Sequence, residues 1–436
     1  MASDFLDQAL KNINEGLEKV KDAKGRVIAP SVADALRDFC RQEPATCSCR
    51  GEGGMSTEVT SDQERTSAEK ISAFVQKQHL PYSAKVKHAA KRAREFYNDS
   101  RVDGNVCVSV GGLDSITLMV FLHSLHIDAV PVSVSALEDN SIKRVHRALG
   151  VQGIKPYKSK VAVLRDCGFP VISKAKARKI NLLQKPNCEK QTFIHAIMTG
   201  DMGEQGHFQH SDKIKLPDKW LKLFAGLYAE HRPDLDCQTA PFPVGADCCW
   251  WMKEKPVQDW QKEHGLFPYL GLMASEGGQR ELGLKKNGCN YFGKTTTRSC
   301  PFAIFMRDDL LRLALEMDAY YQEHWQEFNP DPAARVDSII PEIYGEIAQR
   351  EDGTLYTTKA QRTGCQMCGF GIHMEKRPHR FDRLRERNEK EWEFWMYRCA
   401  TDPETGEKYG WGRVLDYIGV GWEDVPNAQA SLFEEE

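Results

Sequence analysis

The clearest hydrophobic pattern in the chain is the stretch Asn105 to Leu125, N-V-C-V-S-V-G-G-L-D-S-I-T-L-M-V-F-L-H-S-L. Its first part, Val106 to Val110, is apolar on both faces, which is typical of a buried parallel strand. From Ile116 onward, the apolar residues recur as in a buried helix. The pattern therefore predicts a strand and a helix joined by a tight turn that contains Gly111 and Gly112.

Strand and helix patterns continue to alternate after this stretch. We expect a second apolar strand at 129–135, a helix at 141–149 and a third strand at 153–157. Such alternation predicts an α/β fold with a doubly wound parallel sheet. Ligands bind such sheets at the carboxyl ends of the strands, where Ser109 to Ser115 and Glu138 would both lie. Glu138 is therefore a candidate ribose or adenine contact.

The turn after the first strand is suited to an anion. Gly111 and Gly112 put no side chain in the way, so backbone N–H groups and the positive end of the helix dipole can converge on a phosphate. Asp114 and Ser115 close the turn. The spacing matches neither the dinucleotide fingerprint nor the Walker loop. The alternative is an ordinary strand-turn-helix corner without a ligand.

Two cysteine pairs with the spacing of metal ligands lie far apart in the sequence: Cys248 and Cys249, and Cys365 and Cys368. A C-x-x-C pair bends two thiolates toward one metal, and a second pair completes a four-thiolate site that suits zinc or iron–sulfur. The alternative is two unrelated pairs. Because adjacent ligands are sterically awkward, Cys289 or Cys300 is an open substitute for one of the tandem cysteines.

The glycine turn resembles the S-G-G-x-D-S pyrophosphate loop of the adenine nucleotide alpha-hydrolase superfamily, with Val110 as one extra or substituted position. Three further features follow in order: the run G-F-P-V-I-S-K ending at Lys174, the tandem cysteines, and Ser275-Glu276 with Arg280. Together with the C-x-x-C pair, this set resembles the phosphoadenosine phosphosulfate (PAPS) reductase family over roughly residues 95–425.

The resemblance implies an enzyme that binds ATP or an adenylyl sulfonucleotide, with Mg²⁺ recruited through the phosphates and Asp114. It also implies a [4Fe–4S] cluster on the four cysteines. The candidate nucleotide-binding residues are Ser109, Gly111, Gly112, Asp114, Ser115, Glu138, Lys174, Lys253 and Arg280. The expected division is a helical segment (1–40), a linker (41–67), the nucleotide-binding domain (68–300) and a C-terminal helical region with the C-x-x-C pair (301–436).

The chain departs from the reductases in two respects. It lacks their C-terminal Glu-Cys-Gly-Leu-His motif, so Cys399 is the candidate replacement nucleophile, with a helix-borne core residue as the alternative. It also keeps the Gly-Gly-x-Asp-Ser form of loop that is typical of ATP-cleaving members. Besides sulfonucleotide reduction, we therefore consider ATP-dependent sulfur transfer to tRNA or DNA, and a non-catalytic nucleotide-binding regulator. An electron-donor or sulfur-donor protein is the expected partner of either enzyme.

Composition narrows these alternatives. No apolar run approaches a membrane span and the N-terminal region has no signal-like pattern, which predicts a cytoplasmic protein with no membrane partner. Fourteen cysteines in 436 residues then indicate reduced thiols. The net charge of −3 argues against wholesale coating of nucleic acid. A local basic patch is still allowed, and the basic residues from Lys85 to Arg94 on a predicted helix are one candidate.

Overall fold

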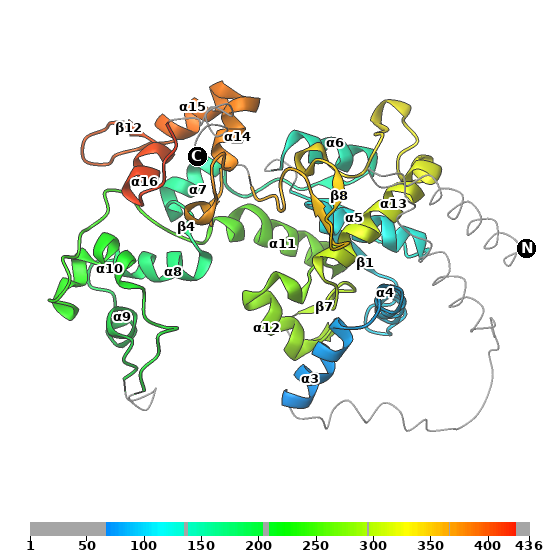
Figure 1. The fold of residues 1–436 in the computed structure, drawn as a ribbon, viewed down its shortest axis with the longest axis horizontal. Helices are drawn as coiled ribbons and strands as arrows, with labels where there is room; N and C mark the ends of the chain where they lie inside the picture. Colours follow the sequence, from blue (N-terminus) through cyan, green and yellow to red (C-terminus); the bar gives the residue numbers. More distant parts are fainter. Residues whose placement is uncertain (1–66, 135–137, 204–208, 294–295, 366, 424–436) are drawn as a thin grey trace, which may run out of the picture. The chain divides into compact units, whose positions relative to one another are not determined.

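The computed structural model describes residues 67–134, 138–203, 209–293, 296–365 and 367–423 (Figure 1). These residues form two compact units, each built from two separate segments of the chain. The first unit contains the described residues up to Lys155 together with Val257–Thr363, and the second contains Pro156–Pro256 together with the described residues from Gly364 onward. The predicted N-terminal segment 1–40, and the predicted linker up to residue 66, lie outside the described residues.

The first unit is built on a six-stranded sheet of order β3-β2-β1-β5-β7-β6. Its elements are α3 (Ser67–Gln78), α4 (Tyr82–Tyr97), β1 (Val106–Ser109), α5 (Leu113–Ser124), β2 (Val130–Ser133), α6 (Asn140–Ala148), β3 (Gln152–Gly153), α11 (Lys255–His264, which begins in the second unit), β5 (Phe267–Tyr269), η5 (Ala274–Glu276), α12 (Gly278–Asn287), β6 (Asn290–Phe292), β7 (Thr297–Ser299), α13 (Arg307–Phe328), η6 (Pro332–Ala334), η7 (Glu342–Tyr344), β8 (Ile347–Gln349) and β9 (Leu355–Thr357). All neighbours in the sheet are parallel except β6 and β7. The fold is thus mixed α/β with a mostly parallel central sheet, as predicted.

The strand order reverses at β1. From β1 the chain moves outward through β2 to β3, and it later returns to β5 on the other side of β1. Such a reversal opens a crevice beyond the carboxyl ends of the two central strands, which is where ligands bind open α/β sheets. The turn from Val110 to Gly112 directly follows β1, so the predicted anion loop lies at this point.

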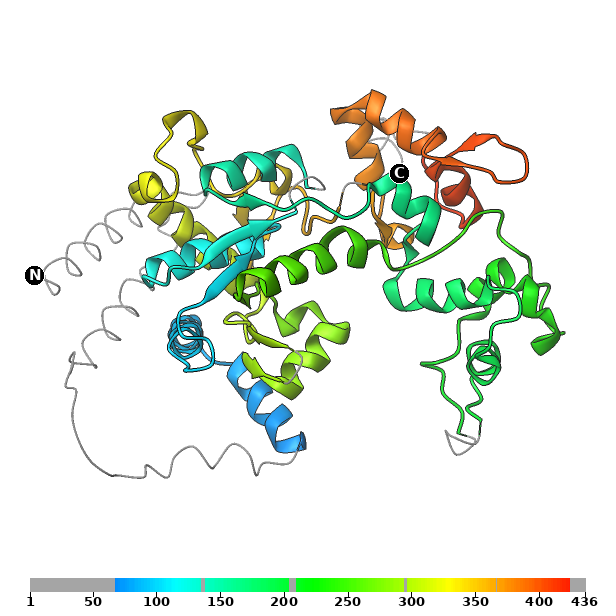
Figure 2. The same ribbon diagram turned by 180° about the vertical axis from the view of Figure 1, so that it is seen from behind.

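Hydrophobic burial holds the β1–α5 pair in place. Val106, Cys107 and Val108 of β1 are almost completely buried, and so is the run of apolar residues in α5. The helix has no polar face because α13 packs along its outer side (Figure 2). Each large apolar side chain buried in this way contributes about 1.5–3 kcal/mol. The loop between the two elements is therefore supported at both ends by a rigid core.

The second unit is mainly helical. Its elements are α7 (Lys160–Cys167), β4 (Val171–Ile172), α8 (Lys174–Leu183), α9 (Gln191–Thr199), α10 (Asp218–Phe224), η3 (Gly226–His231), the π-helical turn η4 (Trp250–Glu254), β10 (Gly369–Phe370), η8 (Ile372–Met374), α14 (Arg380–Arg387), α15 (Glu389–Tyr397), β11 (Ala400–Thr401), β12 (Lys408–Tyr409) and α16 (Trp411–Tyr417). Strands β4 and β10 pair in parallel, so segments far apart in the sequence meet next to the C-x-x-C pair.

Trp411 is the centre of this unit's core. It is fully buried, and its ring packs edge-on against Phe169 and Phe381, with ring centroids 5.0 Å and 5.2 Å away. A Cβ atom on Gly369 would lie 2.4 Å from the Trp411 ring. Only glycine fits there, which lets β10 approach the core closely and anchors the backbone immediately after Cys368.

The predicted elements near the loop agree with the structure except at one position. The helix predicted to carry Lys85 to Arg94 is α4, and the second strand and following helix are β2 and α6. The third strand, expected at 153–157, comprises only Gln152 and Gly153. Within the described ranges, no helix has both the length and the apolar character needed to cross a bilayer.

Candidate functional site

The turn between β1 and α5 is closed by a tyrosine from far along the first unit. The Tyr344 hydroxyl accepts a hydrogen bond from the Leu113 N–H at 3.0 Å and shares another with the Thr363 hydroxyl at 2.7 Å. A Cβ atom on Gly112 would lie only 2.4 Å from Tyr344 Oη and 2.9 Å from Thr363 Oγ1. With Tyr344 in place, only glycine therefore fits at position 112.

A buried histidine fixes the direction of the same turn. His146 of α6 lies with Nε2 2.8 Å from the Gly111 carbonyl oxygen, and because a carbonyl only accepts, Nε2 carries the proton. The C=O and N–H of a planar trans peptide point in opposite directions. Holding the Gly111 carbonyl on His146 therefore aims the N–H of Gly112 away from the histidine.

The loop amides are only partly free for a ligand. The Gly111 N–H donates to Ser115 Oγ at 2.7 Å, and this hydroxyl donates to the Gly112 carbonyl at 3.0 Å. The Leu113 amide is taken by Tyr344. Within the described part of the chain, the amides of Gly112 and Asp114 meet no protein acceptor. Fewer amides than the sequence suggested are therefore available to the predicted anion, namely those of Gly112 and Asp114.

Asp114 is held in an ion pair. Its Oδ1 accepts from Arg307 Nη1 at 2.6 Å, and Arg307 also donates to the Gln361 carbonyl at 2.9 Å. Burial raises the pKa of Asp114, and Glu276 raises it further, while Arg307 opposes the shift. A metal ion would have to compete with Arg307 for this carboxylate.

Arg280 also has a partner. It pairs with Glu276 at 2.5 Å, and Arg362 lies 3.8 Å from the same carboxylate oxygen. The guanidinium groups of Arg280 and Arg362 are more than half exposed. Three arginines thus pair with two carboxylates, Asp114 and Glu276. The local excess of positive charge could attract a phosphate or sulfate.

The other residues predicted for the first unit flank the loop. Ser109 Oγ accepts a long hydrogen bond from Gln261 Nε2 at 3.3 Å. Glu138 is buried, and its Oε1 lies 3.9 Å from where a Cβ on Gly111 would be. The structure therefore brings Ser109, Glu138 and the loop together at one edge of the sheet, although the loop and Glu138 lie on different strand connections.

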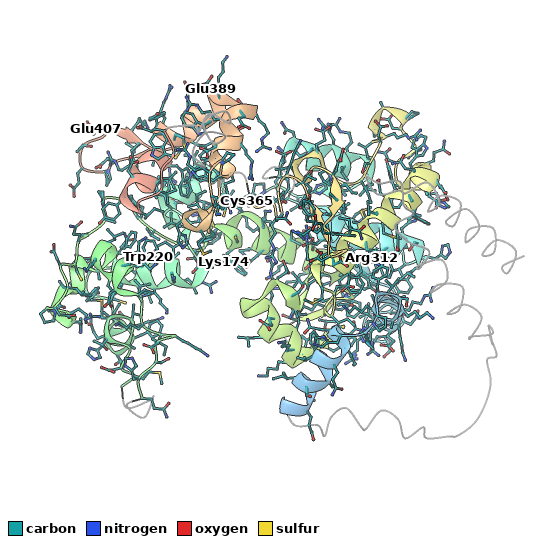
Figure 3. The ribbon with its side chains drawn as sticks, in the orientation of Figure 1. Lys174, Trp220, Arg312, Cys365, Glu389 and Glu407 are labelled. Atoms are coloured by element: carbon teal, nitrogen blue, oxygen red, sulfur yellow. The ribbon has the colours of Figure 1, made fainter. Side chains whose placement is uncertain are left out.

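The tandem cysteines begin a helix in the second unit and directly precede its π-helical turn. Cys248 donates a hydrogen bond to Cys249, which raises the pKa of Cys248 and lowers that of Cys249. Lys174, labelled in Figure 3, lies at the start of α8. Its side chain also hydrogen-bonds Cys249. Lys253 adds further positive charge near the Cys249 thiol. Cys249 is thus the member of the pair that ionises more readily.

The C-x-x-C pair interacts with the tandem pair. The Cys365 and Cys368 thiols both raise the pKa of Cys248 electrostatically, and Cys249 acts in the same way on Cys368. Between Cys365 and Cys368, the Cys368 N–H donates to the Cys365 carbonyl at 3.0 Å, which closes a tight turn. The four predicted ligands therefore belong to one region of one unit.

A lysine that the sequence did not single out lies beside the C-x-x-C pair. Burial lowers the pKa of Lys160 to about 8, while the thiols of Cys365 and Cys368 act in the opposite direction. Its Nζ lies 4.7 Å above the ring of Trp395. Arg380 adds a second cation, which donates to the Cys368 carbonyl at 3.0 Å. Glu375 pairs with Arg380, so Lys160 is the cation of these two that has no carboxylate partner in an ion pair within the described residues.

The four thiols do not surround a single point. Among the described residues, no three cysteine, histidine or carboxylate side chains converge closely enough to hold one metal ion. In a [4Fe–4S] cluster each cysteine binds a different iron, so its sulfurs lie further apart than on one zinc ion. Four thiols are a donor set that both zinc and iron–sulfur clusters use.

Cys399 has the surroundings of a core thiol. Its side chain is 2% exposed, and Sγ donates to the Trp395 carbonyl at 3.2 Å. Burial raises the pKa of Cys399 to about 12. Because the thiolate is the nucleophile, this environment does not favour the catalytic role predicted for it.

Two other expectations concern residues with packing roles. Cys289 and Cys300 are buried in the first unit, and burial raises their pKa values to about 11 and 12. Lys85, part of the predicted basic surface on α4, is buried in an ion pair with Asp309 at 2.6 Å. Lys85 therefore does not contribute to a nucleic-acid surface, and that expectation is wrong for this residue.

Several site residues were missed because nothing in their local sequence marks them. His146, Arg307 and Tyr344 contact the loop only through the tertiary fold. Lys160 sits in a K-S-K run that looks like solvated surface. Of the predicted nucleotide-binding residues, Lys174 and Lys253 belong to the second unit and the others to the first.

Comparisons of the chain with protein-family models, with curated proteins and with solved structures find no match.

The difference between the cysteines predicts selective alkylation. In metal-free folded protein at pH 8, iodoacetamide should modify Cys249 readily and leave Cys399 unmodified, because with a pKa of about 12 on the order of one Cys399 in 10⁴ is ionised. Mass spectrometry of peptides maps the labels, and urea-unfolded protein is the control in which both cysteines react. Labelling of Cys399 in the folded protein as fast as in the unfolded protein would contradict its assignment as a core thiol.

Proposed function

We propose that this chain is an enzyme of sulfur chemistry related to the PAPS reductases. In this proposal, the first unit binds an adenine nucleotide, ATP or a sulfonucleotide, and the cysteines of the second unit hold a [4Fe–4S] cluster. The observation that carries the proposal is the glycine turn at the reversal of strand order, with the N–H of Gly112 aimed by His146. A doubly wound sheet of the adenine nucleotide alpha-hydrolase type is the fold class that we propose for this unit.

The nucleotide phosphates would accept hydrogen bonds from the N–H groups of Gly112 and Asp114. The helix dipole of α5 also favours negative charge there. Arg280 and Arg362 can turn from Glu276 to the phosphate or sulfate oxygens because both side chains are largely exposed. Mg²⁺ would arrive mainly through the phosphates, since Asp114 is engaged by Arg307. Glu138, whose Oε1 lies 3.9 Å from the position of a Cβ on Gly111, would contact the nucleoside.

The proposed cluster would be held by Cys248, Cys249, Cys365 and Cys368, and when bound it would supply electrons or local charge. The chain itself supplies positive charge to this region through Lys160, Lys174, Lys253 and Arg380. Nearby cations lower the cost of placing thiolates where they are partly desolvated, because direct attraction offsets lost hydration. An electron-donor or sulfur-donor protein would complete either reaction.

ATP-dependent sulfur transfer to RNA or DNA is the second candidate, and the state of Cys399 favours it. Reduction of a sulfonucleotide needs a thiolate that attacks the sulfur, whereas Cys399 is buried and protonated. Transfer that is driven by cleavage of ATP uses the glycine loop and does not need this cysteine. A nucleotide-binding regulator without turnover is the remaining alternative.

The loop geometry predicts that His146 supports nucleotide binding without touching the nucleotide. His146→Leu removes the donor to the Gly111 carbonyl, so affinity for ATP should fall about two- to tenfold, the value of one hydrogen bond. His146→Gln keeps an N–H donor and should recover part of the loss. His79→Leu, at an exposed histidine, is the matched control. Calorimetric titration that gives equal affinity for His146→Leu and the parent would move the nucleotide elsewhere.

The cluster assignment predicts a brown protein after anaerobic purification, with about four irons per chain. Cys365→Ser should lose most of the iron and of the visible absorption, while Cys237→Ser, in the same unit, should keep both. Zinc would give a colourless protein. Unchanged iron content in Cys365→Ser would refute this ligand set.

A further inference from the structure

The second unit contains a cavity of about 390 Å³ that the proposed nucleotide loop does not use. Its chemically active lining consists of Lys174, Arg178, Asp247, Trp250, Trp251 and Glu254. Two cations, two indole rings and two carboxylates thus face one space. The cavity directly adjoins the tandem cysteines, because Lys174 hydrogen-bonds Cys249.

Two local structures build this lining. Lys174 and Arg178 are four residues apart on α8, which places them on the same face of the helix. The tryptophans belong to the π-helical turn that follows Cys249, where the Lys255 N–H donates to the Trp250 carbonyl five residues earlier. Such turns are rare and frequently occur at functional sites. Lys174 and Glu254 form an ion pair at 3.0 Å across the cavity lining.

The aromatic and cationic character continues beyond the cavity. Lys158 Nζ lies 5.0 Å above the ring of Trp251, and Lys255 Nζ lies 5.5 Å above the ring of Tyr157. Trp250 is 40% exposed and Tyr157 is 53% exposed. These rings and lysines form a strip, and two of its members, Lys255 and Tyr157, lie outside the cavity lining.

We infer that this strip binds an unpaired segment of a nucleic acid, with one base in the cavity. Bases stack on exposed aromatic rings, and the backbone phosphates follow a line of cations. Asp247 and Glu254 can accept hydrogen bonds from the amino groups of a base. The same carboxylates would repel a simple anion or an acidic peptide, so the mixed lining favours a nucleotide.

The ring and lysine outside the cavity lining favour a strand over a free nucleotide. A mononucleotide would fill the cavity and leave the Lys255 and Tyr157 pair without a role. Beside the cysteines, the strand would be the acceptor of the sulfur atom. That assignment rests on the proposed function. Binding of the strand does not depend on it, because no loop residue of the first unit is involved.

The test is fluorescence anisotropy of a labelled single-stranded oligonucleotide, RNA and DNA in turn, titrated with the full chain. Trp250→Ala should weaken binding by between about fivefold and a hundredfold, the usual range for loss of one stacked base. Trp250→Phe should recover most of the affinity. Phe394→Ala is the matched control, because Phe394 is 39% exposed in the same unit.

Salt dependence separates the charged from the aromatic contacts. Arg178→Ala should reduce the slope of log affinity against log salt by about 0.7, as expected for one lost phosphate contact with a single strand. Trp250→Ala should leave the slope unchanged, and so should Lys390→Ala, which removes an exposed lysine elsewhere in this unit. A duplex of the same sequence should bind more weakly, because its bases cannot stack on the protein.

Three results would overturn this inference: no binding of either strand by the parent, equal affinity of Trp250→Ala and Phe394→Ala, or full displacement of the strand by AMP in the His146→Leu variant. The last result would assign the cavity to a free nucleotide. Strand binding should survive in His146→Leu, whose ATP affinity is reduced. Failure of the strand site can therefore be told apart from failure of the nucleotide loop.

Discussion

The contact between Tyr344 and the glycine turn is the constraint from which the geometry of the first unit follows. The Tyr344 hydroxyl would lie 2.4 Å from a Cβ atom on Gly112, so it excludes any side chain at that position. The same hydroxyl accepts a hydrogen bond from the Leu113 N–H and thereby caps the first turn of the helix. His146 anchors the preceding carbonyl. With both ends of the turn fixed, the Gly112 amide is directed before any ligand arrives, which reduces the cost of ordering on binding.

Cations lie beside carboxylates near the loop and beside thiols near the cysteine pairs. Arg280 and Arg307 neutralise carboxylates in the first unit, and Lys160 and Lys174 lie beside thiols in the second. This arrangement compensates charge within each unit.

The sequence allowed the loop and its two flanking elements to be predicted, because continuous apolar runs report burial and paired glycines report a close turn. Spacing and the family resemblance also pointed to the two cysteine pairs, which interact electrostatically in the structure. The sequence could not identify Tyr344, Arg307 or His146, which reach the loop only through tertiary packing. Nor could it place G-F-P-V-I-S-K, where β4 pairs with β10 after Cys368. A two-residue strand carries no periodicity that would reveal its partner.

The products formed from two nucleotides test the proposal that the glycine loop binds and activates an adenine nucleotide. Anaerobic protein is supplied in parallel with ATP and with PAPS, each with a thiol reductant, and AMP, pyrophosphate and sulfite are measured. AMP and pyrophosphate from ATP should exceed sulfite from PAPS, because Cys399 is buried and protonated. Rapid sulfite release that disappears in Cys399→Ser, without any AMP from ATP, would contradict the proposal.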